Sequence, residues 1–131
     1  MRSGKPPINV LVIDDDEIAR EYMCDVLRKA GFVVEDMPSS IGVTNKVVRD
    51  QYQVVVIDVM MPAIRGDKLA SLLRKNPQLR GLGVVMVSGA LREELEQLGP
   101  DIDPDRVVNK GQARTELVAA VHKAYEERDA K

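Results

Sequence analysis

Aromatic side chains are scarce in this chain: among its 131 residues there are three Tyr, one Phe and no Trp. Proteins that bind single-stranded nucleic acid stack bases on aromatic side chains, and proteins that bind duplexes or anionic membranes carry a clear excess of positive charge. The formal net charge here is −2, from 19 basic and 21 acidic residues. We therefore expect neither direct nucleic-acid binding nor attachment to a membrane surface.

Cysteine and long apolar runs are also scarce. Cys24 is the single cysteine, which excludes an internal disulfide and a cysteine-based zinc site. No run reaches the roughly 18 apolar residues that a membrane helix needs. The residues before Ile8 contain no apolar stretch of the kind found in secretory signals. These absences predict a cytoplasmic protein whose lone thiol is buried and inert.

What the sequence does contain is a regular succession of short aliphatic runs, which begin at Val10, Val33, Val54, Val84 and Val107. Each interval is long enough for one helix and two short loops. Such alternation is typical of a parallel sheet covered on both faces by helices. We predict one α/β domain with a doubly wound five-stranded parallel sheet, strand order 2-1-3-4-5, in a flavodoxin-like three-layer sandwich.

Apolar residues at helical spacing place one helix after each run. The expected helices surround residues 19–30, 43–48, 69–73, 91–98 and 113–124. Asp16 is interpreted as a helix N-cap, Gly31 as a C-cap, and the loop 38–40 as containing the N-cap of the second helix.

Polar side chains of complementary charge follow four of the runs. Asp14 and Asp15 follow the first, Asp58 closes the third, Ser88 the fourth and Lys110 the fifth. In such a sheet the functional crevice lies outside the carboxyl ends of the strands, where the strand order switches. Because clustered carboxylates repel one another unless a cation neutralises them, we predict a site for a divalent cation and a phosphoryl group.

This arrangement resembles the receiver domain of bacterial two-component response regulators. The resemblance covers roughly residues 7–127, with residues 1–6 and 128–131 as tails. It rests on Asp14-Asp15, on Asp58 followed by Met61-Pro62 and Gly66, on Ser88-Gly89 and on Lys110.

The resemblance implies a role for each site residue. Asp58 would accept phosphate, Ser88 would hydrogen-bond a phosphoryl oxygen, and Lys110 would pair with phosphate or, before phosphorylation, with Asp58. Mg2+ or Mn2+ would be bound by Asp14, Asp15, Asp58 and the backbone carbonyl of Met60. The donor would be a histidine kinase or a histidine phosphotransfer protein. Output would be contact between a downstream protein and the face formed by the fourth helix, fifth strand and last helix. The chain would catalyse its own phosphorylation and slow dephosphorylation without being a turnover enzyme.

The chain departs from the family pattern near the site. Gly111 stands where a proline usually follows the lysine, so glycine's freedom is expected to shape that loop. Val107 replaces a usual aromatic residue, which makes switching by an aromatic rotor unavailable. Met60 and Ala90 occupy positions whose side chains influence the attacking water, and neither can hold water by a strong hydrogen bond. Slow self-dephosphorylation is the consequence we predict.

Other functions remain open at this point. A pseudo-receiver, meaning an interaction module with little phosphorylation, is suggested by Val107 and Gly111. A phosphohydrolase with an Asp nucleophile would want a second Asp where Met60 stands. A flavin-binding flavodoxin would need a phosphate loop after the first strand, where the acids of residues 14–17 would repel the ligand.

Overall fold

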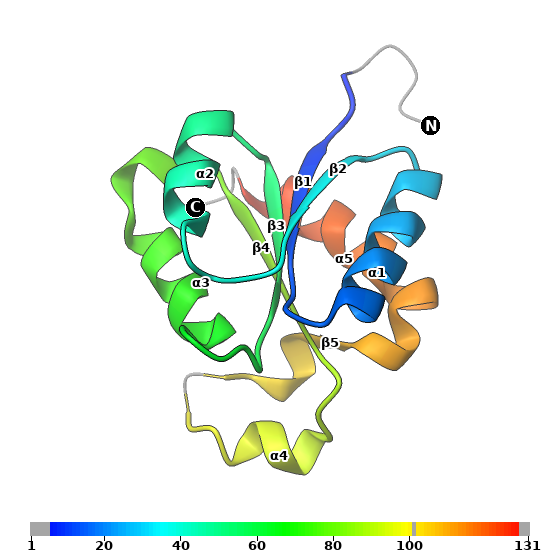
Figure 1. The fold of residues 1–131 in the computed structure, drawn as a ribbon, viewed down its shortest axis with the longest axis vertical. Coiled ribbons are helices and arrows are strands. Elements are labelled where there is room, and N and C mark those ends of the chain that lie inside the picture. Colours follow the sequence, from blue (N-terminus) through cyan, green and yellow to red (C-terminus); the bar gives the residue numbers. More distant parts are fainter. Residues whose placement is uncertain (1–5, 101, 129–131) are drawn as a thin grey trace.

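A five-stranded parallel sheet forms the centre of the molecule, in the order β2-β1-β3-β4-β5 (Figure 1). The computed structural model describes residues 6–100 and 102–128. The strands are β1 (Asn9–Ile13), β2 (Val33–Met37), β3 (Val54–Asp58), β4 (Gly83–Ser88) and β5 (Val107–Asn109). The predicted fold class and strand order are confirmed.

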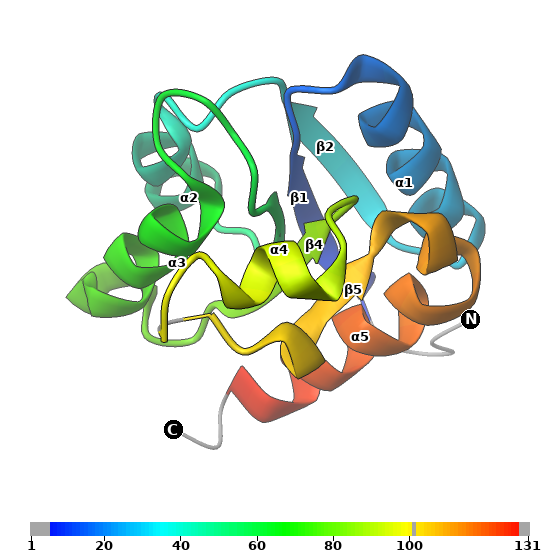
Figure 2. The same ribbon diagram turned by 90° about the horizontal axis from the view of Figure 1, so that it is seen from below.

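Five α-helices surround the sheet: α1 (Glu17–Lys29), α2 (Val43–Asp50), α3 (Gly66–Lys75), α4 (Arg92–Glu96) and α5 (Ala113–Glu127). Helices α1 and α5 cover one face, and α2 and α3 cover the other (Figures 1 and 2). Three short 3-10 turns span Pro77–Leu79, Pro104–Arg106 and Lys110–Gln112. None of the helices within the described residues is long and apolar enough to cross a membrane. Of the predicted tails, Pro6 and Arg128 are described; the rest lies outside the described residues.

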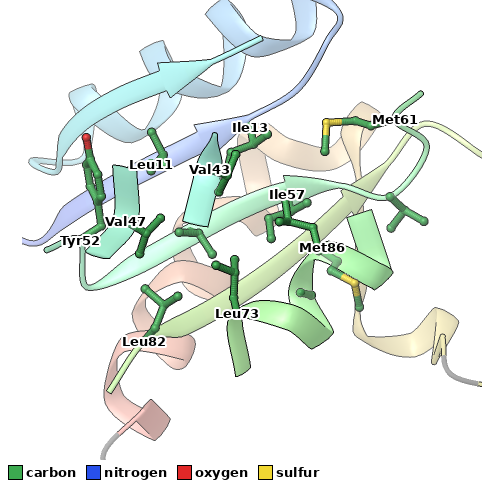
Figure 3. Packing of buried hydrophobic residues seen from close by; sticks show 14 of the residues in the cluster. Leu11, Ile13, Val43, Val47, Tyr52, Ile57, Met61, Leu73, Leu82 and Met86 are labelled. Carbon is green, nitrogen blue, oxygen red and sulfur yellow. The ribbon is translucent and has the colours of Figure 1, made fainter. Parts of the chain in front are cut away.

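Side chains of the central strands alternate between two apolar clusters, because successive residues of a strand point to opposite faces. Leu11, Ile13 and Ile57 pack against α2 and α3 (Figure 3), while Val12 and Val56 pack against α1 and α5. All of these residues are fully buried. Burial on both faces explains why the strands appear in the sequence as unbroken aliphatic runs, and it gives the strand ends a rigid base.

The caps predicted for the first helix agree with those in the structure. The Asp16 carboxylate accepts from the N–H groups of Ile18 and Ala19, which confirms it as the N-cap of α1. Gly31 adopts a left-handed φ of 97° just after the C-cap, Ala30, as expected of a glycine that ends a helix.

Two expectations about helices were wrong. No residue of the loop 38–40 caps α2; its N-cap is Gly42, because the hydroxyls of Ser39 and Ser40 accept from the N–H groups of Ile41 and Ile64 instead. Helix α4 stops at Glu96 and does not continue to residue 98. Only Leu95 within α4 is buried, so its apolar stripe is too short to hold a longer helix against the core.

Candidate functional site

The acids singled out in the sequence meet at the carboxyl edge of the sheet. Strands β1 and β3 pair in register from Val10 and Val54 to Ile13 and Ile57, so the residues that follow, Asp14 and Asp58, lie side by side. Carboxylate oxygens of Asp14, Asp15 and Asp58 all lie within 4.8 Å of one another. In Figure 1 the loops that carry them gather at the lower end of the sheet.

Lys110 bridges the two buried acids of this cluster. Its Nζ lies 2.7 Å from Oδ2 of Asp14 and 3.2 Å from Oδ2 of Asp58. The expected pairing with Asp58 is therefore present, but the shorter contact is with Asp14, which the sequence did not indicate. One ammonium group thus neutralises part of the charge of two carboxylates.

Burial sets the electrostatics of the site. Asp14 is 0% and Asp58 3% exposed, whereas Asp15 lies at the open surface. Burial raises the pKa of Asp58, and Asp14 raises it further, although Lys110 opposes both. Burial would lower the pKa of Lys110, but the two carboxylates outweigh it and the pKa is raised. The pocket therefore carries more negative charge than one lysine can balance.

The donor atoms fit a small divalent cation. Oδ2 of Asp14 is buried and is paired with Nζ of Lys110 at 2.7 Å. Oδ1 of the same residue accepts from the Asp16 N–H at 3.0 Å. Mg2+ takes about six hard oxygen ligands and usually keeps several waters, so two buried carboxylates and the exposed Asp15 suit it.

Met60 lies in the bend after β3, where its N–H donates to Oδ1 of Asp58 at 3.3 Å. This bond orients the carboxylate from the side of its own loop. The role expected of the Met60 carbonyl as a metal ligand stays a prediction.

Ser88 ends β4, next to the strand that carries Asp58. Its Oγ accepts from the Ala90 N–H at 3.0 Å, which leaves the hydroxyl hydrogen free to donate. A Cβ added to Gly89 would lie 3.9 Å from Cδ of Lys110. The lysine stem therefore passes close to Gly89, and the Ser88 loop and Lys110 both lie beside the acidic cluster.

Gly66, at the start of α3, lies directly against the backbone of the Asp58 strand. A Cβ at this position would overlap the carbonyl oxygen of Asp58 and lie 2.8 Å from its carbonyl carbon. The Gly66 N–H also donates to the Val59 carbonyl at 2.8 Å. The sequence indicated Gly66 only through the family resemblance; the structure supplies the steric reason.

Arg20 is a contributor that sequence reasoning missed. Its Nη1 donates to the backbone carbonyl of Asp14 at 2.9 Å, and its Nε donates to Oδ2 of Asp36 at 2.7 Å. The Arg20 side chain is only 13% exposed. It fastens the loop after β1 to the end of β2. In the sequence it is one arginine among many, and no signal distinguishes it.

The loop after Lys110 corrects one expectation. Residues Lys110–Gln112 form a 3-10 turn, in which Oδ1 of Asn109 accepts from the Gly111 N–H at 2.7 Å. The left-handed glycines within the described residues are Gly31, Gly42 and Gly99. Gly111 therefore does not shape the loop by a glycine-only conformation; the Asn109 side chain does. Val107 is half-buried and packs against the cluster on the α2 and α3 side.

The fold and the acidic cluster define a class of proteins that structural comparison identifies. A sensor protein from Polaromonas sp. JS666 superposes with a TM-score of 0.81 and 25% identity, over 94% of this chain and 99% of that one. A putative response regulator from Chloroflexus aurantiacus gives 0.77 and 24%, over 92% and 99%. The chemotaxis response regulator CheY4 of Vibrio cholerae gives 0.71 and 22%, over 88% and 99%; identities this low show the shared fold alone.

Residues 10–122 match the response regulator receiver domain, and the chain belongs to this family. It is 30% identical over 115 residues to the phosphate regulon transcriptional regulatory protein PhoB of Klebsiella pneumoniae, covering 86% of this chain and 49% of that protein. It is 29% identical over 112 residues to the gliding motility regulatory protein of Myxococcus xanthus, covering 86% and 14%. The chain thus spans less than half the length of these two relatives. The resemblance drawn from the sequence is confirmed.

Proposed function

We propose that Asp58 accepts a phosphoryl group from a histidine kinase or a histidine phosphotransfer protein, with Mg2+ or Mn2+ held at the same pocket. The observation that carries this proposal is a nearly buried Asp58 carboxylate 3.2 Å from Lys110 and within 4.8 Å of two further acids. Buried acids with a positive counterion are costly for stability alone. Their presence at the open edge of the sheet favours a chemical role.

The chemistry is a single displacement at phosphorus. An Asp58 carboxylate oxygen attacks phosphorus as the bond to the donor's imidazole nitrogen breaks; the electron pair stays on that nitrogen, and an acyl phosphate forms on Asp58. Lys110 offers positive charge to the transferring group, and the Ser88 hydroxyl offers a hydrogen bond. The residues that would hold the metal are Asp14, Asp15, Asp58 and the carbonyl of Met60. When bound, the ion neutralises phosphoryl charge.

Signalling would follow from the redistribution of Lys110. Before phosphorylation this lysine is shared between Asp14 and Asp58. A phosphoryl group on Asp58 would bring new anionic oxygens within its reach, and Lys110 directly follows β5. With Val107 in place of an aromatic residue, the change would pass through Lys110 and the Ser88 loop to the face formed by α4, β5 and α5, where a downstream protein would bind. A cytoplasmic location and the absence of a turnover activity are part of this proposal.

Phosphorylation by a small donor tests the assignment. The purified chain is incubated with acetyl phosphate and Mg2+, and intact and peptide masses are measured. We expect a gain of one phosphoryl group on the peptide that contains Asp58, and no gain in Asp58→Asn, which keeps the size of the side chain. If chelation of the metal abolishes this increase in mass, the result would support participation of the ion in phosphorylation.

Failure of the wild-type chain to gain mass would favour the pseudo-receiver instead. In that case the departures at Val107 and Gly111 would mark a domain that keeps the fold and binds partners without phosphorylation.

A further inference from the structure

Helix α3 exposes a cationic face that takes no part in the site described above. Four of its residues, Lys68, Ser71, Leu72 and Lys75, are spaced so that they share one side of the helix. The opposite side is buried against the sheet through Leu69, Ala70 and Leu73. In Figure 1 α3 lies at the outside of the molecule. This face is called the α3 cationic face below, and Arg74 is included in it.

Within the described residues, the cations of the α3 cationic face form no ion pair. Lys68, Arg74 and Lys75 are exposed and form no ion pair there. From Lys68 to Arg92 the sequence contains no Asp or Glu. The nearest acid, Asp67, is 8% exposed and is bound by two nitrogens of Arg65, at 2.5 and 2.9 Å. Lys68 also helps to lower the pKa of Asp67, so this acid offsets part of the charge at the start of α3. Arg74 and Lys75 form no ion pair within the part of the chain that the structure describes.

The face is also hollowed. A depression of about 450 Å³ is lined by Asp67, Lys68, Ser71, Arg74 and Lys75. Although Arg74 is exposed as a whole, partial burial of its guanidinium and the nearby cation Arg106 lower its pKa, so an additional negative charge beside it is favourable. Arginine presents a planar set of donors that matches a carboxylate, and the Ser71 hydroxyl adds a neutral donor.

We propose that the α3 cationic face binds a partner protein through an acidic amphipathic segment of that partner. Carboxylates of the segment would enter the hollow beside Arg74 and Lys75, and an apolar side chain would pack on Leu72. Leu72 is 54% exposed beside Lys68 and Lys75 on the same side of the helix, so the site offers apolar contact as well as charge. This inference does not depend on phosphorylation of Asp58.

Nucleic acid and membrane fit the face less well. Helix α3 carries no aromatic residue on which a base could stack, and the net charge of the chain is −2. One exposed leucine gives too little apolar area for insertion into a bilayer. A second copy of this chain would contribute its acids from a different face, such as Glu93. Such a head-to-tail contact gives a ring or an open filament, not the two-fold dimer that is the commonest oligomer.

A defined probe tests the inference: a 16-residue helical peptide of glutamates with two leucines four positions apart, titrated into the ¹⁵N-labelled chain at low ionic strength. We expect amide shifts concentrated on residues 68–75. The double variant Arg74→Glu/Lys75→Glu should raise the dissociation constant of the peptide at least about tenfold, and Leu72→Gln should raise it about fivefold. Glutamate and glutamine suit an exposed helix, and circular dichroism checks the fold.

The matched control is Arg114→Glu/Lys123→Glu on α5, which exchanges the same two residue types at exposed positions and should change affinity less than about twofold. Equal weakening of binding by both double variants, or no effect of Leu72→Gln, would show that the face attracts any polyanion without specificity, and would overturn the inference. Absence of binding, or equally tight binding of an oligo-dT of the same charge, would also overturn it. So would self-association of the chain that the α3 variant abolishes.

Discussion

Lys110 illustrates at the scale of single residues how burial, and not only sequence position, fixes the site. Its ammonium lies closer to Asp14 than to Asp58, at 2.7 against 3.2 Å. Position after the fifth strand predicted that Lys110 would reach the rim. Its division between two carboxylates depends on how the loops after β1, β3 and β5 bring the three side chains together, and the sequence does not show this.

Gly66→Ala should damage both stability and the site, because the new methyl group would overlap the Asp58 backbone. We expect a loss of about 1–3 kcal/mol in the free energy of unfolding, with slower phosphorylation by acetyl phosphate. Urea denaturation and mass spectrometry measure the two effects. Gly89→Ala is the control: its Cβ meets only Lys110, at 3.9 Å, and stability should change by less than about 0.5 kcal/mol. Equal stability of the two variants would contradict the steric account.

Met60→Asn should shorten the lifetime of the phosphorylated chain. Met60 is 47% exposed, so the exchange leaves the core intact, and an amide can hold a water that a thioether cannot. We expect slow decay in the wild type and decay about tenfold faster in the variant, measured as loss of the phosphorylated mass in Mg2+. Loss within seconds in the wild type would refute the slow decay expected from Met60 and Ala90.

At the scale of elements, α3 begins with an ion pair that holds its first turn. Arg65 donates to both carboxylate oxygens of Asp67. Burial raises the pKa of Asp67, but these bonds outweigh it and the pKa is lowered. A lowered pKa in the folded state contributes stability above the ordinary Asp value of 3.8, and this contribution is lost as the pH falls through the folded pKa.

Asp67→Asn should therefore reduce stability at pH 7 by about 1–3 kcal/mol and leave a smaller difference from the wild type below pH 3.8. Urea unfolding at several pH values measures this. Asp25→Asn serves as control, because Asp25 is 62% exposed beside Lys29 and such pairs contribute about 0–1 kcal/mol. A constant difference at every pH would show that the charge of Asp67 is not involved.

For the whole molecule, metal binding at the acidic cluster is expected to raise the folding stability. If Asp14, Asp15 and Asp58 bind Mg2+ only when folded, the ion stabilises the folded state by about 2.7 kcal/mol at a hundred times its dissociation constant. Thermal unfolding with MgCl2, against NaCl of equal ionic strength, should show the increase. An equal melting temperature in both salts would exclude a metal site of useful affinity.

Asp58→Asn gives the complementary result at this scale. Because burial and Asp14 raise the pKa of Asp58, its charge destabilises the folded state at neutral pH. The variant should therefore be more stable than the wild type without metal and gain less from Mg2+. A marked loss of stability without metal would show that the pair with Lys110 outweighs the repulsion.

The amino-acid sequence alone predicts the sheet, its strand order and the edge where the candidate site lies, because strands buried on both faces appear as unbroken aliphatic runs. Asp14, Asp58 and Lys110 follow from those strand ends. Three features are seen only in the folded chain: the hydrogen bonds from Arg20 to Asp14 and Asp36, the hydrogen bond from the Gly111 N–H to Asn109, and the end of α4 at Glu96. Each depends on contacts between residues distant in the chain or on local hydrogen bonds that compete with one another. The periodicity of the sequence does not predict such contacts.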